Sequence, residues 1–544
     1  MSAYSTVSRG ALRGIVLVLL ILAPGLSARK FYEDDPVQKE PLPVNAANIK
    51  GRKLSDYYDF FSNTFRKPGE PQRKGKLIPA RAVNTLGEVP DSAWYTNRHY
   101  LTPMRMEELE RGPGAAAAPD TSGPLTVVAA KTAGVMPGFR MRDAKGHLYF
   151  VKFDPKTNPE MATAADMIVS KFLYALGYNV PENYLFTFNR HQLRVAPDAT
   201  VTDAQGKRRP MTDRDVTEIL LTVPQTADGR YRIVASLGIA GKSVGEFRYY
   251  GTRQDDPNDI VPHEHRRDLR GLRVFCAWLG HDDTRNVNTF DALVEQDGRK
   301  FIKHYLIDFG AALGSDSNWP NSPRSGNVYW FDWTTSAEQL FSLGLAVPRW
   351  ARATYPKIPA VGRFEADIFD PEKWVPFYPN AAFVNCLPDD AFWAAKQVMA
   401  FTDDQIRAIV KTGQYSDPEA ENWIVQCLIK RRDKIGKAYF AKVLPLDRFE
   451  VHGSELVFDD LAVKHGLLGS RDYTVQWSRF NNDTEQKTQL AGDTSFALPR
   501  QLQEAAVGEY FAADISGVDK QKTITVYLRK SAGGVRIVGI DRTW

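Results

Sequence analysis

This chain has few cysteines and a small net charge. Only three of its 544 residues are cysteines (Cys276, Cys386 and Cys427), far apart and each in an apolar setting. This spacing excludes a metal site built from paired cysteines and allows at most one disulfide, so we expect buried free thiols. A formal charge of +5 is small for this length and gives no argument for nucleic-acid binding, which requires a concentrated basic face. We expect the basic runs 66–81 and 430–442 to be solvated surface.

Long hydrophobic runs are also scarce. The one near the N-terminus, residues 15–22, is aliphatic but short for a membrane span. It follows Arg9 and Arg13 and precedes the small pair Ser27-Ala28, which is the layout of a secretory signal peptide with cleavage after Ala28. We therefore expect an exported protein, periplasmic or extracellular. An uncleaved N-terminal anchor is the alternative and would be the chain's one membrane contact.

The length exceeds one ordinary domain, and no internal repeat is visible. Residues 29–122 have the composition of an extended arm that ends in a Gly- and Ala-rich linker, with Trp94 and Tyr95 suited to pinning it to the main body. Apolar strand patterns follow at residues 125–130, 139–142 and 148–153. The polar composition of residues 190–211 predicts an excursion on the surface.

Lys152 lies inside the apolar strand 148–153, where an ammonium is costly unless it meets an anion. A helix follows, with Asn158 as its expected cap and Gly177 as its end. Two acids of this helix could pair with Lys152. Glu160 lies in the first turn, opposite the apolar stripe, whereas Asp166 borders the stripe about one turn deeper and is favoured.

The most informative segment is residues 281–310. Asp283 is followed after four residues by Asn288, and Asp308 opens the triplet Asp308-Phe309-Gly310 behind an apolar strand. A lone triplet of this kind arises by chance, but its combination with the earlier Asp and Asn is more specific. Phosphoryl transfer requires such a set, because one carboxylate orients the attacking hydroxyl while an amide and a second carboxylate hold magnesium. The alternative is structural: Asp283 and its neighbour Asp282 cap a helix, and Asp308 ends a strand.

The segment resembles the catalytic and metal-binding loops of the protein-kinase-like superfamily, and is closer to its atypical branches (HipA-type, CotH-type and phosphoinositide-kinase-like). His281-Asp282-Asp283 replaces the His-Arg-Asp of ordinary protein kinases, and a hairpin-like EQDGRK turn lengthens the gap before Asp308. No Ala-Pro-Glu activation-loop ending follows. Gly134 and Gly138 supply two glycines near the place of the phosphate loop, but not the full G-x-G-x-x-G pattern.

The resemblance implies roles for these residues. Asp283 would be the catalytic base, Asn288 and Asp308 the ligands of Mg²⁺ or Mn²⁺, and Lys152 the phosphate contact paired with Asp166. ATP or another nucleotide would be the donor, and Gly134 and Gly138 would lie against its phosphates.

The predicted fold class is α+β: a two-lobed protein-kinase-like core followed by an all-β, sandwich-like domain. The short alternating segments after residue 448 are typical of such a β domain. We expect the following division: signal 1–28, arm and linker 29–122, small lobe 123–240, helical lobe 241–445 and β domain 446–544.

The leading functional hypothesis is a secreted atypical kinase that modifies a hydroxyl of a protein, glycan or small molecule. A catalytically silent kinase-like binding or scaffold protein of the cell envelope is the alternative, favoured by the incomplete glycine loop and by the scarcity of ATP outside the cytoplasm. A structural surface protein that works through its β domain is a third possibility.

Overall fold

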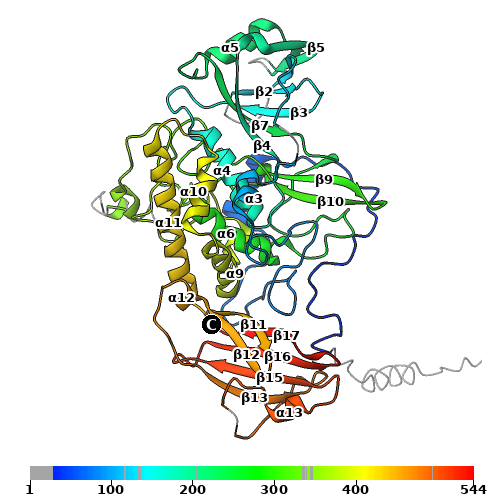
Figure 1. The fold of residues 1–544 in the computed structure, drawn as a ribbon. Helices are drawn as coiled ribbons and strands as arrows, with labels where there is room; N and C mark the ends of the chain where they lie inside the picture. Colours follow the sequence, from blue (N-terminus) through cyan, green and yellow to red (C-terminus); the bar gives the residue numbers. More distant parts are fainter. Residues whose placement is uncertain are drawn as a thin grey trace, which may run out of the picture.

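The small β-rich lobe, the helical lobe and the C-terminal sheet follow one another along the molecule (Figure 1). The computed structural model describes residues 29–115, 118–131, 137–202, 206–333, 337, 340–342, 347–492 and 494–544. This architecture of a β-rich lobe, a helical lobe and an all-β unit confirms the predicted α+β class and the predicted C-terminal β domain. Within the described ranges, no helix is long and apolar enough to cross a bilayer. All three cysteines are free, as expected.

The small lobe is a seven-stranded sheet with the strand order β4-β7-β3-β2-β1-β5-β6. Its strands are β1 (Leu125–Ala130), β2 (Gly138–Arg142), β3 (Leu148–Lys152), β4 (Asn183–Phe188), β5 (Leu193–Thr202), β6 (Arg208–Pro210) and β7 (Tyr231–Leu237). The first three strands form an antiparallel meander, as their apolar runs predict. Lys152, the last residue of β3, pairs with Gly138 on one side and Val234 on the other.

The prediction for residues 190–211 is wrong in part. After the turn η2 (Arg190–Gln192), the chain forms β5, which runs parallel to β1, and β6 beyond it. Only Leu193, Ala196 and Ala199 of β5 are buried, so the strand pattern is hidden among exposed polar residues. Helix α5 (Asp213–Leu221) packs on this edge and completes the core of the lobe.

Helix α4 (Met161–Ala175) joins the small lobe to the helical lobe. Its predicted cap, Asn158, is wrong: the carboxylate of Asp154 accepts the first free N–H groups, from Ala162 at 2.9 Å and Thr163 at 2.8 Å. Asn158 instead donates to the carbonyl of Pro359. A charged acceptor suits the positive end of a helix better than an amide does. Gly177 follows the helix with φ +108°, the left-handed conformation that ends helices.

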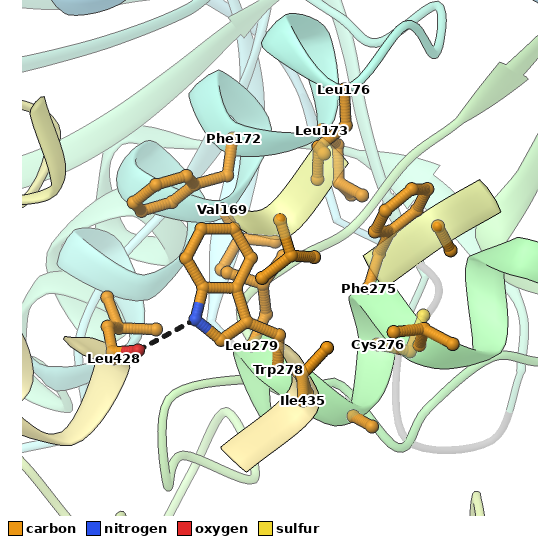
Figure 2. Packing of buried hydrophobic residues seen from close by; sticks show 14 of the residues in the cluster. Val169, Phe172, Leu173, Leu176, Phe275, Cys276, Trp278, Leu279, Leu428 and Ile435 are labelled. Carbon is orange, nitrogen blue, oxygen red and sulfur yellow. Dashed lines mark hydrogen bonds between the residues drawn. The ribbon is translucent and has the colours of Figure 1, made fainter. Parts of the chain in front are cut away.

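The helical lobe is built around one large apolar core. Its helices are η3 (His263–His265), α6 (Arg267–Leu279), η5 (Arg349–Arg352), α8 (Ala381–Val384), α9 (Pro388–Met399), α10 (Asp403–Lys411) and α11 (Pro418–Phe440). Figure 2 shows Trp278 of α6 at the centre, with its indole N–H donating to the carbonyl of Leu428 at 2.9 Å. Phe172 of α4 packs edge-on against this indole, so α4 shares the core of the helical lobe.

The C-terminal unit is a five-stranded antiparallel sheet with a two-stranded hairpin packed on one face. Its elements are β11 (Leu446–His452), β12 (Glu455–Asp460), α12 (Leu461–Lys464), β13 (Thr474–Phe480), β14 (Lys487–Gln489), α13 (Arg500–Gln503), β15 (Tyr510–Ser516), β16 (Thr523–Ser531) and β17 (Gly534–Arg542). Alternate residues cover the two faces: Ile515 and Leu528 face the hairpin core, whereas Ala512 and Tyr527 face the opposite side.

The N-terminal arm is ordered and touches all parts of the fold. Its helices are α2 (Asp56–Phe61), the π-turn η1 (Ser62–Arg66) and α3 (Met106–Arg111). Phe31 inserts into the open face of the C-terminal sheet, between Phe480 and Tyr527. Trp94 stacks on His304 of the helical lobe with ring centroids 3.5 Å apart, and Tyr95 is almost fully buried. The arm therefore packs as part of the core.

A buried ion cluster fastens the C-terminal unit to the helical lobe. The Asp447 carboxylate accepts hydrogen bonds from Lys396 at 2.9 Å, Arg542 at 3.3 Å and the Tyr100 hydroxyl. Burial raises the pKa of Asp447, but the cations Lys396 and Arg542 outweigh it and lower this pKa to about 2.

We expect Asp447→Ala to lower the free energy of unfolding by about 3–5 kcal/mol, because it removes the carboxylate paired with the buried Arg542 and leaves the buried Lys396 with Glu88 alone. The wild-type contribution should be present above about pH 4, the unfolded pKa of Asp, and be lost as pH falls through about 2. Urea unfolding at several pH values measures both effects. Asp483→Ala is the control, because its ion pair with Arg29 is exposed and should contribute less than about 1 kcal/mol. Equal costs for the two variants would contradict the structural role of Asp447.

Candidate active site

A β-hairpin brings the two predicted metal ligands to the same place. Strands β9 (Thr289–Gln296) and β10 (Arg299–Leu306) pair in register, with Thr289 opposite Leu306, and β8 (Lys242–Gly245) completes this small sheet. Asp297 and Gly298 both have positive φ, as a two-residue type I′ turn requires. Asn288 immediately precedes β9 within the turn η4 (Asn286–Asn288), and Asp308 follows β10. The register therefore fixes both residues at the open end of the hairpin.

Lys152 lies at the centre of the site. Its ammonium donates to Asp166 Oδ2 at 2.6 Å and to Asp308 Oδ1 at 2.8 Å, so three distant segments meet at one nitrogen. Burial alone would lower the pKa of Lys152, but the two carboxylates outweigh it and the pKa is raised. The lysine is therefore cationic at any physiological pH.

Asp166, rather than Glu160, is the helix carboxylate that meets Lys152. Its other oxygen accepts the Asn183 amide at 3.0 Å and the backbone N–H of Phe309 at 3.4 Å, so the carboxylate is fixed on both sides. Glu160 instead accepts the N–H of Ser416, at the junction with the helical lobe. The shorter side chain of Asp suffices because α4 lies close to β3.

Asp308 lies in the left-handed conformation, with φ +63°. Burial raises the pKa of its carboxyl, but the cations Lys152 and Lys131 outweigh it and lower this pKa to about 2. One carboxylate oxygen is bonded to Lys152, and the side chain is 35% exposed, so the other oxygen is open to a ligand. Phe309, next in sequence, is fully buried in the core of the helical lobe and anchors the turn.

Lys131 is a site residue that the sequence patterns do not predict. It follows β1, and its N–H donates to the carbonyl of Gly138, which places the two ends of the glycine loop side by side. Burial lowers the pKa of Lys131, and the charges of Asp308, Lys152 and Asp166 act on it. Within the described ranges, its ammonium has no hydrogen-bond or ion-pair partner. It has no sequence signal beyond its place at a strand end.

Gly138 has a structural reason to be glycine. A Cβ at this position would overlap the carbonyl oxygen of Val151, one residue before Lys152. Close pairing of β2 on β3 beside the lysine therefore requires glycine. Gly134, the other predicted glycine, lies outside the described residues.

Asp283 is partly exposed beside the hairpin and is held by an arginine. Arg285 makes a bidentate ion pair with the Asp283 carboxylate, in which Nη2 lies 2.9 Å from Oδ2. Its Nη1 also donates to Asp56 of the arm at 2.7 Å. Asn288 donates its amide N–H to the backbone carbonyl of Asp283 at 2.7 Å, which leaves the amide oxygen of Asn288 free for another partner. The position of Arg285, two residues after Asp283, is the one sequence signal for its role.

Asp282 and His281 hold the start of the Asp283–Asn288 loop through hydrogen bonds to the segment after Asp308. Asp282 is buried, accepts a hydrogen bond from the Ser325 hydroxyl and lies 3.4 Å from the amide nitrogen of Asn321. Burial raises the pKa of Asp282 to about 7, with a further contribution from the charge of Asp283. His281 bonds the carbonyl of Ala311 at 2.9 Å. Neither side chain joins the ion cluster around Lys152.

The oxygen atoms of Asn288 and Asp308 are the groups available to a divalent cation. Both are hard ligands of the kind that Mg²⁺ and Mn²⁺ take in nucleotide sites, where one or two protein ligands suffice because phosphates and waters complete the shell. In the described part of the chain, no cluster of three or more His, Cys, Asp or Glu side chains could hold a metal by itself. The residues present therefore fit a metal that arrives with a nucleotide.

No protein-family model and no curated protein match the chain. Among solved structures, it is similar to the proinflammatory kinase CtkA of Helicobacter pylori, with 12% identity, a TM-score of 0.31, and coverage of 60% of this chain and 99% of that one. It is also similar to the Golgi casein kinase with Mn/ADP bound (9% identity, TM-score 0.28, 62% and 77% coverage). A second structure of the Golgi casein kinase gives 8% identity, a TM-score of 0.28 and 75% and 96% coverage. We draw no functional conclusion from similarity at this level.

The raised pKa of Asp282 gives a testable pH dependence. Between about pH 4 and 7, the folded state keeps one proton on Asp282 that the unfolded state releases, so the wild-type free energy of unfolding should fall as pH rises through this window. Asp282→Asn does not titrate, so its stability relative to wild type should increase over the same window. Urea unfolding at pH 4.5 and 7.5 measures the difference. The exposed Asp404→Asn is the control. A stability difference between wild type and Asp282→Asn that stays constant with pH would contradict the buried, protonated state.

Proposed function

We propose that this protein is a kinase-like phosphotransferase that uses a Mg- or Mn-bound nucleotide to modify a hydroxyl acceptor. The observation that carries the proposal is the shared ammonium of Lys152, held between Asp166 on α4 and Asp308 behind β10. This ammonium is buried between two carboxylates that come from separate segments of the chain, and the desolvation of all three groups is costly. The same three groups are those that phosphoryl transfer requires for the donor.

Each residue would have a distinct part in this reaction. Asp308 and Asn288 would hold the metal, whose charge offsets the negative charge that develops on the phosphates. Lys152 would contact the phosphates of the donor, and Asp166 would keep the ammonium in place. Asp283 would accept the proton of the acceptor hydroxyl while the new O–P bond forms and the bond to the nucleotide leaving group breaks.

Lys131 would supply the positive charge that the incomplete glycine loop does not. Its ammonium lies near Asp308 and Lys152 and lacks a partner among the described residues. The charges of Lys131 and Lys152 balance those of Asp166 and Asp308, so this cluster has no net charge. The anionic phosphates would therefore be attracted by the metal and by the ammonium of Lys131.

A catalytically silent nucleotide-binding module is the second candidate. One observation favours it: both carboxylate oxygens of Asp283 are engaged by Arg285, so an acceptor hydroxyl would have to share them with the guanidinium. In the transferase, Arg285 would instead keep Asp283 oriented, and its second contact, to Asp56, would hold the arginine in place. Export of the protein, predicted from residues 1–28, stays a proposal, because these residues lie outside the described ranges.

Asp308→Asn separates donor binding from catalysis. Asn tolerates the left-handed backbone of this position and still accepts the Lys152 hydrogen bond, so the fold should survive. We expect the variant to lose metal-dependent nucleotide binding, because an amide only partly replaces an anionic metal ligand. Thermal shift with ATP, with and without Mg²⁺ or Mn²⁺, measures this binding. A wild-type protein at a hundredfold excess over Kd should gain about 2.7 kcal/mol.

Asp283→Asn is the matched comparison, and the exposed Asp404→Asn is the control. Asp283→Asn should keep the nucleotide response but lose most phosphate transfer, because Asp283 acts on the acceptor. The transferase proposal is contradicted by an equal nucleotide response of wild type and Asp308→Asn. A wild type that binds Mg-nucleotide and transfers nothing to water, peptide or glycan hydroxyls would favour the silent module.

Lys131→Met tests whether this lysine replaces the missing glycine loop. A hydrogen bond to a charged group contributes about 1.5–3 kcal/mol, so the loss of this cation should weaken nucleotide binding by about tenfold or more. Lys131→Arg keeps the charge and should restore most of the affinity. Isothermal titration with Mg-ATP measures both variants. Unchanged affinity of Lys131→Met would show that the lysine does not meet the phosphates.

A further inference from the structure

An exposed row of aromatic rings begins beside the catalytic loop. Phe61, Phe65, Phe331 and Trp333 follow one another with ring centroids 5.8, 5.3 and 5.2 Å apart. Their exposed fractions are 57, 54, 38 and 74%. We call these four residues the aromatic ridge. Contiguous exposed apolar surface of this kind marks an interaction site in a soluble protein.

The ridge is connected to the catalytic loop through its inner end. Phe60 touches both Phe61 and Tyr378, and the Tyr378 hydroxyl donates to the buried carboxylate of Asp59 at 2.5 Å. The same carboxylate accepts the amide of Asn286, inside the Asp283–Asn288 loop, at 2.6 Å. A continuous chain of contacts therefore links the ridge to the loop that carries Asp283.

A basic segment continues directly from the ridge. Residues 66–76 carry five exposed cations and one acid. None of the five has an ion-pair partner among the described residues; they are Arg66, Lys67, Arg73, Lys74 and Lys76. The sequence alone predicts solvated surface here. Cations without ion-pair partners that follow exposed aromatic rings in the chain could instead bind an anionic partner.

We infer that the aromatic ridge and the basic segment dock the protein on an anionic lipid bilayer as a peripheral contact. Phe and Trp rings insert at the boundary between head groups and acyl chains, while Lys and Arg meet anionic head groups. Two of the ridge residues are Phe side chains from the arm, which offer no hydrogen bond and so favour lipid over a glycan. The charge of the segment matches an anionic surface and opposes a basic one. Docking would bring Asp283 to the membrane surface, a consequence that rests on the proposed function.

Vesicle binding tests the docking without any need for catalysis. The full chain should co-sediment with phosphatidylglycerol vesicles and bind phosphatidylcholine vesicles much more weakly. The double variant Phe65→Ser/Trp333→Ser should lower the partition coefficient at least tenfold. Tyr32→Ser/Trp544→Ser is the matched control, because both rings are exposed elsewhere, and should bind as wild type. Unchanged melting temperatures would show that each variant is folded.

The basic segment has its own test. Arg73→Gln/Lys74→Gln should weaken binding several-fold and reduce its dependence on salt, whereas Lys430→Gln/Lys437→Gln on α11 should not. The inference is overturned if wild type does not bind phosphatidylglycerol vesicles, or if the ridge variant binds them as wild type does, which would assign the contact to another segment such as residues 1–28. Ridge-dependent retention on polysaccharide without vesicle binding would overturn it in favour of a glycan. A wild-type protein that binds phosphatidylglycerol vesicles but does not bind nucleotide would overturn the proposed function and leave the docking inference in place.

Discussion

One buried ammonium joins the small lobe to helix α4 and to the hairpin β9–β10. Lys152 is placed by β3, Asp166 by α4 and Asp308 by the hairpin β9–β10, and each position is fixed by a different set of contacts. Removal of Lys152 would leave two carboxylates without their shared cation in a largely buried site, which costs far more than an exposed ion pair contributes. The ion cluster therefore ties sheet, helix and hairpin to one geometry. This is the geometry in which a nucleotide and a metal could be held.

The N-terminal arm sets the second constraint. Sequence composition describes residues 29–122 as an extended segment, yet Phe31, Trp94 and Asp59 are buried in three different parts of the fold. Burial raises the pKa of Asp59, while hydrogen bonds from Tyr378, Asn286 and Asn63 act in the opposite direction. The Asp283–Asn288 loop therefore has one of its supports in a segment more than 200 residues away, and a core cut at residue 123 would lack it.

The sequence predicts the site residues that belong to a local pattern, but not those that meet the site only through folding. Asp283, Asn288 and Asp308 stand out because their spacing along the chain reflects one loop and one hairpin. Lys152 stands out because a cation inside an apolar strand needs an anion. Lys131 and the Asp56–Arg285 contact have no such local pattern, since their meaning comes from residues brought together only by folding. The failed cap at Asn158 has a different origin: Asp154 lies only eight residues before Ala162, but outside the position next to the helix at which a cap is normally sought.

The buried carboxylate of Asp59 connects the Asp283–Asn288 loop to the aromatic side chains of the arm. One oxygen of the Asp59 carboxylate accepts the amide of Asn286 in the Asp283–Asn288 loop, and the other accepts the hydroxyl of Tyr378. The Asp283–Asn288 loop and Tyr378 are thus held by the same buried carboxylate. Because Tyr378 packs on Phe60, and Phe60 on Phe61 of the aromatic ridge, the proposed active site and the proposed docking surface share one support.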